Sequence, residues 1–316
     1  MNQIKIIKNR SDIGAGTRGS DMGIDAIEVA AINANNDYFT RFKYIDLDTD
    51  NETVYNKVNA LFAKRIEKVR EQCERVSDAV EKSLNDGNFT IVLSGDHSSA
   101  LGTISGVKAA FPNDHIGVVW IDAHSDLHSP FTTPSGNVHG MPLAAALNND
   151  NIEYQINEVS SSTQAIWKQL QNVGIVGQKL LPENLLFFGV RDSEPTEDKI
   201  IKQFNLRNYK VEEIRYRGLE VCMNDALKQL KNCDHIYISF DVDSLDCDMI
   251  SPGTGTPVSK GFDSNEIIAI IQFLLSSKKV VCLEITEVNP LLDTKGNKMA
   301  EAAFEILNAV TPHFIS

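Results

Sequence analysis

The sequence has no long hydrophobic run and few cysteines. No segment approaches the roughly 20 apolar residues that are needed to span a bilayer, so we do not expect a membrane protein. The 316 residues include 5 cysteines, which are widely spaced and form no CxxC pair. An odd and scattered set argues against both a disulfide framework and a thiolate zinc site. We therefore expect reduced cysteines that serve mostly in packing.

Basic residues are also scarce. The chain has 30 Lys and Arg against 43 Asp and Glu, which gives a formal net charge of −13. Because nucleic acids are bound mainly through clustered Lys and Arg, we do not expect a nucleic-acid partner. A small cationic ligand is electrostatically compatible with this charge. The N-terminal sequence MNQIKIIKNR lacks the apolar core of a secretory signal, which favours a cytoplasmic location.

Short apolar runs alternate with helical patterns along the chain. The runs are IKII (4–7), FKYIDL (42–47), FTIVLSG (89–95), HIGVVWID (115–122), NLLFFGV (184–190), HIYISFD (235–241) and VVCLEIT (280–286). Such continuously apolar strands, each followed by a helix, predict a three-layer α/β/α fold around a mostly parallel sheet. No linker rich in Pro, Gly or Ser divides the chain, so we predict a single domain over residues 1–316.

Two helices are predicted with defined ends. Apolar residues recur at steps of three and four over roughly 52 to 85, and Asn85-Asp86-Gly87 ends this pattern. A second helix is expected to begin at Asp263, because Glu266 follows three residues later as in a capping box.

Acidic residues and histidines follow several of the predicted strands. In parallel α/β sheets, ligands bind beyond the carboxyl ends of the strands. Residues two apart on an extended segment point to the same side, so members of each group can converge. The groups are Asp96 and His97; Asp122, His124 and Asp126; Asp241 and Asp243; and Glu284 and Glu287.

This set predicts a metal site. Asp residues also form turns and helix caps, which explains any one of them but not the whole group. Unpaired carboxylates gathered at a sheet edge repel one another and resist desolvation, and a bound cation removes that conflict. Four aspartates with two histidines form a hard, oxygen-rich set that suits Mn²⁺ better than structural zinc, although Fe²⁺, Co²⁺ and Ni²⁺ stay open. The ligands suffice for two ions that share a carboxylate and a hydroxide.

Five segments in order resemble the ureohydrolase superfamily, and its arginase branch in particular. They are SGDHSSALG, DAHSDLHSPFTTPSGNVHGMP, SFDVDSLD, GTGTPV and EVNPLLD. The resemblance runs from residues 13–28 to the C-terminal helix, and it implies an eight-stranded parallel sheet flanked by helices. It also implies two Mn²⁺ ions per subunit and a homo-oligomer, either trimer or hexamer.

The resemblance assigns the ligands. One ion would be bound by His97, Asp122, Asp126 and Asp241, and the other by His124, Asp122, Asp241 and Asp243, with Asp122 and Asp241 bridging. In the implied reaction, a hydroxide held between the ions attacks the guanidinium carbon of L-arginine, and collapse releases urea and ornithine. The metals and Asp126 would stabilise the tetrahedral intermediate.

The resemblance also assigns residues around the substrate. His139 matches the family's proton-shuttle histidine, and Glu287 matches the carboxylate that orients the guanidinium. Contacts to the amino-acid end of the substrate would come from His128, Ser135, Asn137, Glu194 and Glu197, with Thr256 nearby. His128 and Glu194 depart from the family, which usually has Asn and Asp there, and this puts arginine affinity in doubt more than the chemistry.

Two alternatives remain open from the sequence. An agmatinase, another guanidino-compound amidinohydrolase or a formimidoylglutamase would share the metal motifs, but these relatives generally lack the TTPSGN stretch (132–137). A non-catalytic metal-binding homologue would be expected to have lost a ligand, His139 or Glu287, and none is missing. We expect Glu284 to be a buried structural group, and Trp120 and Phe240 to belong to the core.

Overall fold

Eight strands form one sheet in this computed structural model, which describes residues 3–314. The first two and last two residues of the predicted domain 1–316 lie outside the described residues. The strand order is β2-β1-β3-β8-β7-β4-β5-β6, and every neighbouring pair is parallel. The strands are β1 (Ile4–Asn9), β2 (Lys43–Asp46), β3 (Phe89–Ser94), β4 (Ile116–Ile121), β5 (Leu185–Phe188), β6 (Arg207–Tyr209), β7 (His235–Asp241) and β8 (Val280–Thr286). The predicted α/β class and parallel sheet are confirmed.

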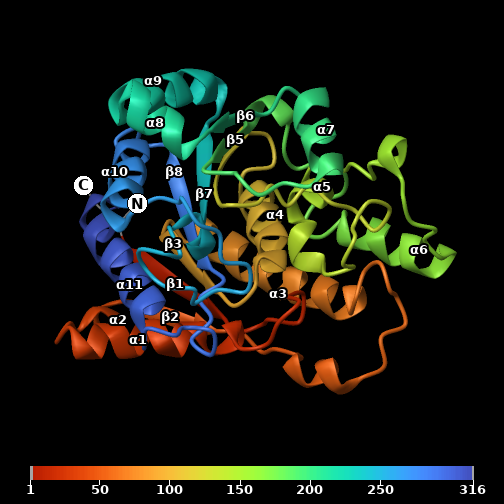
Figure 1. Cartoon of the computed structure of the whole chain (residues 1–316), viewed down its shortest axis with the longest axis horizontal. Helices are drawn as coiled ribbons and strands as arrows, with labels where there is room; N and C mark the ends of the chain where they lie inside the picture. Colours follow the sequence, from red (N-terminus) through yellow and green to blue (C-terminus); the bar gives the residue numbers. More distant parts are fainter. Residues whose placement is uncertain (1–2, 315–316) are drawn as a thin grey trace.

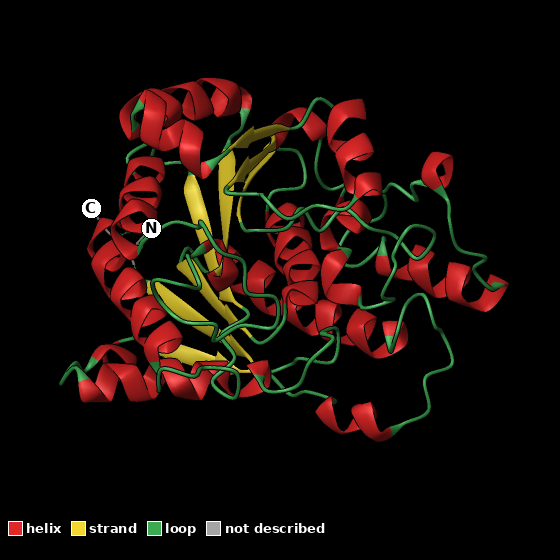
Figure 2. Ribbon diagram, viewed as in Figure 1, coloured by secondary structure: helices red, strands yellow, loops and turns green. Residues whose placement is uncertain are grey.

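Helices cover both faces of the sheet (Figures 1 and 2). One layer comprises α1 (Gly23–Asn33), α2 (Tyr38–Arg41), α8 (Val211–Arg217), α9 (Leu219–Gln229), α10 (Ser264–Leu275) and α11 (Lys298–Val310). The other comprises α3 (Ile66–Asn85), α4 (Ala100–Ala110), α5 (Pro142–Ala146), α6 (Ser161–Leu170) and α7 (Pro195–Gln203). This is the three-layer arrangement that the alternating pattern predicted.

The two faces of the sheet belong to two separate hydrophobic clusters. Alternate residues of β4 divide between them: Val119 and Ile121 pack towards the α1 and α10 layer, and Val118 and Trp120 pack towards the α3 and α4 layer. Because successive side chains of a strand point to opposite faces, a strand buried on both sides must be apolar throughout. Most of the continuous apolar runs are therefore strands inside the sheet, whereas the run at 42–47 forms the edge strand β2, which is largely exposed.

The helix predicted over roughly 52 to 85 begins later than expected. A short 3-10 helix covers Asn51–Tyr55, and α3 begins only at Ile66, after Arg65 with a φ of 57°. The segment between them instead packs on a distant loop, where the Lys64 amide donates to the Gly136 carbonyl at 2.8 Å. Leu61, part of the apparent periodicity, is 67% exposed. A tertiary contact therefore overrides the local pattern.

The other predicted helix boundaries agree with the structure. The long helix α3 ends at Asn85, as predicted. Asp263 caps α10 by accepting from the Glu266 amide at 2.8 Å, and Glu266 accepts in return from the Asp263 amide at 2.9 Å. This reciprocal pair satisfies two amides that the first turn of a helix leaves without partners.

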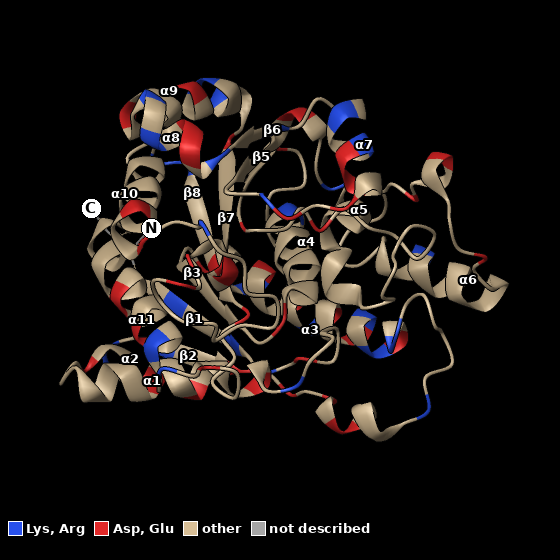
Figure 3. Ribbon diagram, in the orientation of Figure 1, with Lys and Arg blue, Asp and Glu red and all other residues tan. Residues whose placement is uncertain are grey.

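Charged residues are spread over the molecule. Figure 3 shows Lys and Arg interspersed with Asp and Glu on several helices, including α7, α8 and α9.

Within residues 3–314, no helix is long and apolar enough to cross a membrane. All five cysteines are free, and four of them are buried.

Candidate metal and catalytic site

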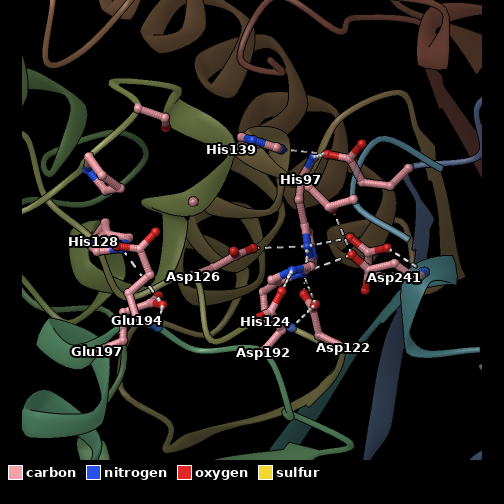
Figure 4. A pocket seen from close by; sticks show the side chains of 16 residues that line it. His97, Asp122, His124, Asp126, His128, His139, Asp192, Glu194, Glu197 and Asp241 are labelled. Carbon is pink, nitrogen blue, oxygen red and sulfur yellow. Dashed lines mark hydrogen bonds and ion pairs between the residues drawn. The ribbon is translucent and has the colours of Figure 1, made fainter. Parts of the chain in front are cut away.

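A cavity of about 280 Å³ opens where the central strands end at their carboxyl side. The loops after β3, β4, β7 and β8, which are neighbours in the sheet, bring their polar residues together there (Figure 4). The cavity is lined by His97, Asp122, His124, Asp126, His128, Pro134, Ser135, His139, Gly140, Asp192, Glu194, Glu197, Asp241, Asp243, Thr256 and Glu287. All six predicted metal ligands are in this group.

The ring of His97 faces three carboxylates at once. Its Nδ1 lies 3.1 Å from an oxygen of each of Asp122, Asp126 and Asp241. None of these contacts has hydrogen-bond geometry, and both His97 Nδ1 and Asp122 Oδ2 are buried without a hydrogen-bond partner. The other ring nitrogen, Nε2, lies 2.7 Å from the Ser239 hydroxyl. Three carboxylate oxygens at the same distance from a ring nitrogen that has no hydrogen-bond partner are an arrangement typical of a metal site.

A second group surrounds His124. Its Nδ1 lies 2.9 Å from Asp243 Oδ2 and 3.6 Å from Asp122 Oδ1. The ligand atoms of His97, Asp122 and Asp241 lie within 4.8 Å of one another, and so do those of Asp122, His124 and Asp243. Asp122 belongs to both groups, so the geometry has room for two neighbouring cations with a shared carboxylate.

Backbone amides fix each of three carboxylates through a single oxygen. Asp122 Oδ1 accepts from the His124 amide at 2.7 Å, and Asp241 Oδ1 accepts from the Asp243 amide at 2.9 Å. Asp243 Oδ1 accepts from the Ala123 amide at 3.0 Å. The remaining oxygens face the two histidines, so the loops hold the carboxylates in place before any ion binds.

The electrostatics of the cluster are unfavourable without a cation. Burial and then the Asp122 charge raise the pKa of Asp126 to about 7. Burial and the charges of Asp243 and Asp122 raise the pKa of Asp241 well above its ordinary value. Burial opposes protonation of His97, yet the three carboxylates that face it raise its pKa well above 6.5. The raised pKa values mean that these groups tend to hold protons, which reduces the negative charge of the cluster. Divalent ions would balance that charge instead.

His139 and Glu287 form a pair beside the cluster. His139 Nδ1 lies 3.1 Å from Glu287 Oε1, which also accepts from the His97 amide at 3.0 Å. Burial lowers the pKa of His139, but the hydrogen bond and charge of Glu287 outweigh it and raise that pKa to about 9. Glu287 has a φ of 66°, an uncommon conformation for a residue other than glycine, of the kind that clusters at functional sites.

The predicted contacts to a substrate's amino-acid end lie in different places. His128, Ser135, Glu194, Glu197 and Thr256 line the cavity. Asn137 is absent from the lining, and its side-chain oxygen accepts instead from Lys64 Nζ at 3.1 Å. Thr256 Oγ1 donates to Asp243 Oδ2 at 3.0 Å, and it therefore also orients a predicted ligand. The substrate-binding roles of these residues stay predictions.

Among the residues that touch the site, Asp192, Arg191 and Trp120 were not predicted to do so. Asp192 Oδ2 lies 3.6 Å from His124 Nε2, the ring nitrogen that faces away from the cluster. Arg191 donates to the carbonyl oxygens of Asp243 and Val258, on both sides of Thr256. Trp120 was expected in the core and is fully buried, but its indole also stacks on His97. The RD pair after β5 was the available signal for the first two.

Other polar residues near the strand ends are structural. Glu284 is fully buried and accepts from the Ser94 and Tyr237 hydroxyls, each at 2.6 Å, on the sheet and away from the cavity. Asp96 accepts from the Gly14 amide at 2.9 Å and from the Ser98 amide at 2.8 Å. Glu284 therefore has the structural place that the sequence predicted.

The chain is similar to arginases over almost its full length. The sequence profile of the arginase family matches residues 2–311. Arginase from Bacillus subtilis (strain 168) is 32% identical over 309 residues, with 97% of each chain covered. Arginase from Brevibacillus brevis is 33% identical over 311 residues, covering 95% of this chain and 94% of that protein. The native structure of Bacillus caldovelox arginase has a TM-score of 0.81 at 30% identity, with 98% of each chain covered.

The parallel sheet, the acid and imidazole cluster at its carboxyl edge and these matches together define a hydrolase of amidino C–N bonds. Within that class, the chain belongs to the arginase family, whose members are metal-dependent. The predicted family and enzyme class are confirmed.

Proposed function

We propose that this protein hydrolyses the guanidinium group of L-arginine to L-ornithine and urea with two Mn²⁺ ions. The observation that carries the proposal is the buried Nδ1 of His97, which has no hydrogen-bond partner and lies 3.1 Å from three carboxylate oxygens. Arginases at about 32% identity support the choice of substrate. The proposal treats residues 1–316 as one catalytic domain, which the single eight-stranded sheet supports.

The residues present fit two hard cations. One ion would be held by His97, Asp122, Asp126 and Asp241, and the other by His124, Asp122, Asp241 and Asp243. When bound, two such ions lower the pKa of a water shared between them and so provide hydroxide at neutral pH. Mn²⁺ suits this mixed carboxylate and imidazole set, whereas Fe²⁺, Co²⁺ and Ni²⁺ are the alternatives that a metal panel would test.

The pair of His139 and Glu287 would serve the organic substrate. Glu287 Oε1 is occupied by His139 and the His97 amide, so Oε2 is available to accept an N–H of a guanidinium. His139 is held protonated by Glu287 up to a pKa of about 9, so it can donate the proton that the leaving amine requires. Asp126, at the edge of the cluster, would accept from the guanidinium-derived nitrogen.

The amino-acid end of arginine would lie between the loop after β4 and the beginning of α7. Ser135 supplies a hydroxyl and Glu194 supplies a half-exposed carboxylate for an α-ammonium group. His128 Nε2 is buried without a hydrogen-bond partner, 3.7 Å from Glu197 Oε2 and 3.9 Å from Glu194 Oε2, and it is available to donate to an α-carboxylate. In this structure Asn137 is engaged by Lys64, so its predicted contact would require that amide to turn.

A panel of substrates crossed with metals tests this function. Urea release from L-arginine, agmatine and formimidoylglutamate would be compared with Mn²⁺, Co²⁺, Ni²⁺ and Fe²⁺. We expect arginine with Mn²⁺ to be fastest, and His124→Ala to lose activity because it removes a ligand. A preference for agmatine would favour an agmatinase. Inactivity on every substrate, with metal still bound, would favour a non-catalytic homologue.

Similarity to other amidino hydrolases does not choose among these substrates. The formimidoylglutamase of Bacillus subtilis is 18% identical with a TM-score of 0.74, and proclavaminate amidino hydrolase from Streptomyces clavuligerus is 20% identical with a TM-score of 0.71. Identities this low reflect the shared fold alone. The substrate panel is therefore the deciding measurement.

The remaining expectations concern the protein's state in the cell. We expect a homo-oligomer, a trimer or hexamer, in the cytoplasm, acting on a small guanidino substrate with no nucleic-acid or membrane partner. Light scattering of the purified protein would give the oligomeric state. The interspersed charges of Figure 3 are consistent with a protein that does not bind a polyanion.

A further inference from the structure

The loop after β4 holds Asp126 in an unusual backbone conformation. Asp126 has a φ of 48°, in the left-handed region that residues other than glycine adopt at a cost in free energy. Its carboxylate nevertheless reaches the cluster, with Oδ2 3.1 Å from His97 Nδ1. A strained conformation persists only where surrounding groups fix it, so neighbours must hold this turn in place.

Glu197, on the first turn of α7, binds the chain on both sides of Asp126. Its Oε1 accepts from the Ser125 hydroxyl at 2.6 Å and from the Leu127 amide at 3.2 Å. Its Oε2 accepts from the Glu194 amide at 3.1 Å. The residue is only 4% exposed. Both carboxylate oxygens are therefore committed to donors of the protein: two hydrogen bonds tie α7 to the turn, and the third caps the first turn of α7.

Glu194 differs from Glu197 although both line the cavity. The side chain of Glu194 is 51% exposed, whereas that of Glu197 is 5% exposed. In Figure 4 the two carboxylates lie side by side near His128, with Asp126 between them and the metal cluster. The Glu194 side chain takes part in capping α7, but its half-exposed carboxylate can still meet a substrate cation, whereas both oxygens of Glu197 are enclosed by protein donors.

We propose that Glu197 is a positioning residue that acts through Asp126, and that it does not bind the substrate's amino-acid end. It fixes the Ser125–Leu127 turn so that the Asp126 carboxylate points at the metal cluster. Glu194 alone then recognises the substrate from α7. The inference deepens the proposed function, on which its kinetic part rests, whereas its metal-binding part stands without it.

The test separates metal binding from substrate binding. Mn²⁺ affinity of the purified full chain would be measured by equilibrium dialysis, and kcat and KM for arginine by urea release. We expect Glu197→Ala to bind Mn²⁺ ~10–100-fold more weakly, the range seen when a group that orients a ligand is removed. At saturating Mn²⁺, kcat should fall while KM changes less than ~2-fold, because uniform substrate binding is not lost.

Two further variants distinguish the positioning role of Glu197 from a general loss of structure and provide a control. Glu197→Gln keeps the oxygen that accepts from Ser125 and Leu127, and it loses only the hydrogen bond from the Glu194 N–H, which then faces the side-chain NH₂ group. Mn²⁺ affinity should therefore be largely restored relative to Glu197→Ala. Glu194→Gln is the matched control: it should raise KM and leave Mn²⁺ affinity unchanged. Far-ultraviolet circular dichroism would verify that each variant is folded.

The outcomes are distinguishable. A rise in KM for Glu197→Ala, with Mn²⁺ affinity and kcat unchanged, would overturn the proposal and make Glu197 a substrate contact. Equal loss of Mn²⁺ affinity in Glu197→Ala and Glu197→Gln would overturn the assigned hydrogen bonds. Absence of urea release from arginine by the unmodified protein would reject the proposed function, and loss of Mn²⁺ affinity in Glu197→Ala would still support the positioning role.

Discussion

The imidazole of His97 lies flat against the indole of Trp120, with ring centroids 4.1 Å apart and planes 7° from parallel. Both rings are buried, and Trp120 Nε1 has no hydrogen-bond partner, so packing alone holds the indole. The stack fixes the plane of the His97 ring, while the Ser239 hydroxyl at 2.7 Å fixes its rotation. Together they direct Nδ1 at the carboxylates.

Replacing Trp120 with Phe should therefore weaken metal binding as well as the fold. We expect Trp120→Phe to lose about 1–2 kcal/mol of unfolding free energy from lost packing, and to bind Mn²⁺ several-fold more weakly. Urea denaturation and equilibrium dialysis would measure the two effects. Trp167→Phe is the matched control, because Trp167 is also buried but donates to Asp150 at 2.8 Å, away from the cavity. Equal Mn²⁺ affinity in both variants would contradict the role of the stack.

Metal should stabilise the folded protein through Asp241. Mn²⁺ that binds only the folded state at 100 times its Kd raises the free energy of unfolding by about 2.7 kcal/mol. We expect chelation to remove that gain, and Asp241→Asn to abolish most of it, because Asp241 Oδ2 faces His97 Nδ1 at 3.1 Å. Thermal unfolding with and without Mn²⁺ is the measurement. Asp114→Asn, which alters an exposed ion pair with His235, should keep the full shift.

The pair of His139 and Glu287 predicts a pH-dependent contribution to stability in the metal-free protein. The pKa of His139 is about 9 in the folded chain against 6.5 ordinarily, so the pair stabilises fully below pH 6.5 and loses its effect as pH rises through 9. Glu287→Gln should lower that pKa. The difference in unfolding free energy from wild type, on the order of 2 kcal/mol at pH 6, should shrink towards pH 9.5.

Two measurements would check this pair. Nuclear magnetic resonance of the histidine ring protons would follow the His139 titration directly, and urea denaturation at several pH values would give the free energies. A difference in unfolding free energy between wild type and Glu287→Gln that stays constant from pH 6 to pH 9.5 would contradict the assigned pairing.

Gly136 should tolerate no side chain. It has a φ of 76°, and an added Cβ would overlap the Leu61 carbonyl oxygen of the segment before α3. We expect Gly136→Ala to lose about 1–3 kcal/mol of unfolding free energy, and to raise KM because Ser135 adjoins it. Gly87→Ala is the control, since Gly87 has a φ of 78° but open space around it. Equal losses by urea denaturation would assign the effect to the φ angle alone.

The central strands could be predicted because burial on both faces leaves no choice of residue. The edge strand β6 was missed, since Arg207-Asn208-Tyr209 is short and polar and pairs on one side only. The early start assigned to α3 was wrong for a different reason. The segment that contains Leu61 and Lys64 packs against Gly136, a residue far away in the sequence, and this contact keeps it out of the helix. Local periodicity has no access to such a contact.

The site, like the sheet, contains residues whose positions could be predicted from the sequence and residues whose positions could not. Asp122, His124, Asp241 and Asp243 could be predicted to converge, because parallel strands deliver their carboxyl ends to one edge of a sheet. The occupied carboxylate of Glu197 and the stack of Trp120 on His97 could not, since both depend on side chains packed between separate elements. Sequence motifs locate the predicted ligands, whereas the groups that orient those side chains emerge only from the three-dimensional packing.

The position of β8 has a consequence for synthesis of the chain. Among the described strands this one comes last in the sequence, yet it inserts between β3 and β7 at the middle of the sheet. A nascent chain that lacks it leaves two strand edges unpaired, which are templates for aggregation. The same stretch delivers Glu287 immediately afterwards. Closure of the sheet and placement of the final acidic group of the cavity thus depend on the same segment, and fragments that end before it are incomplete in both respects.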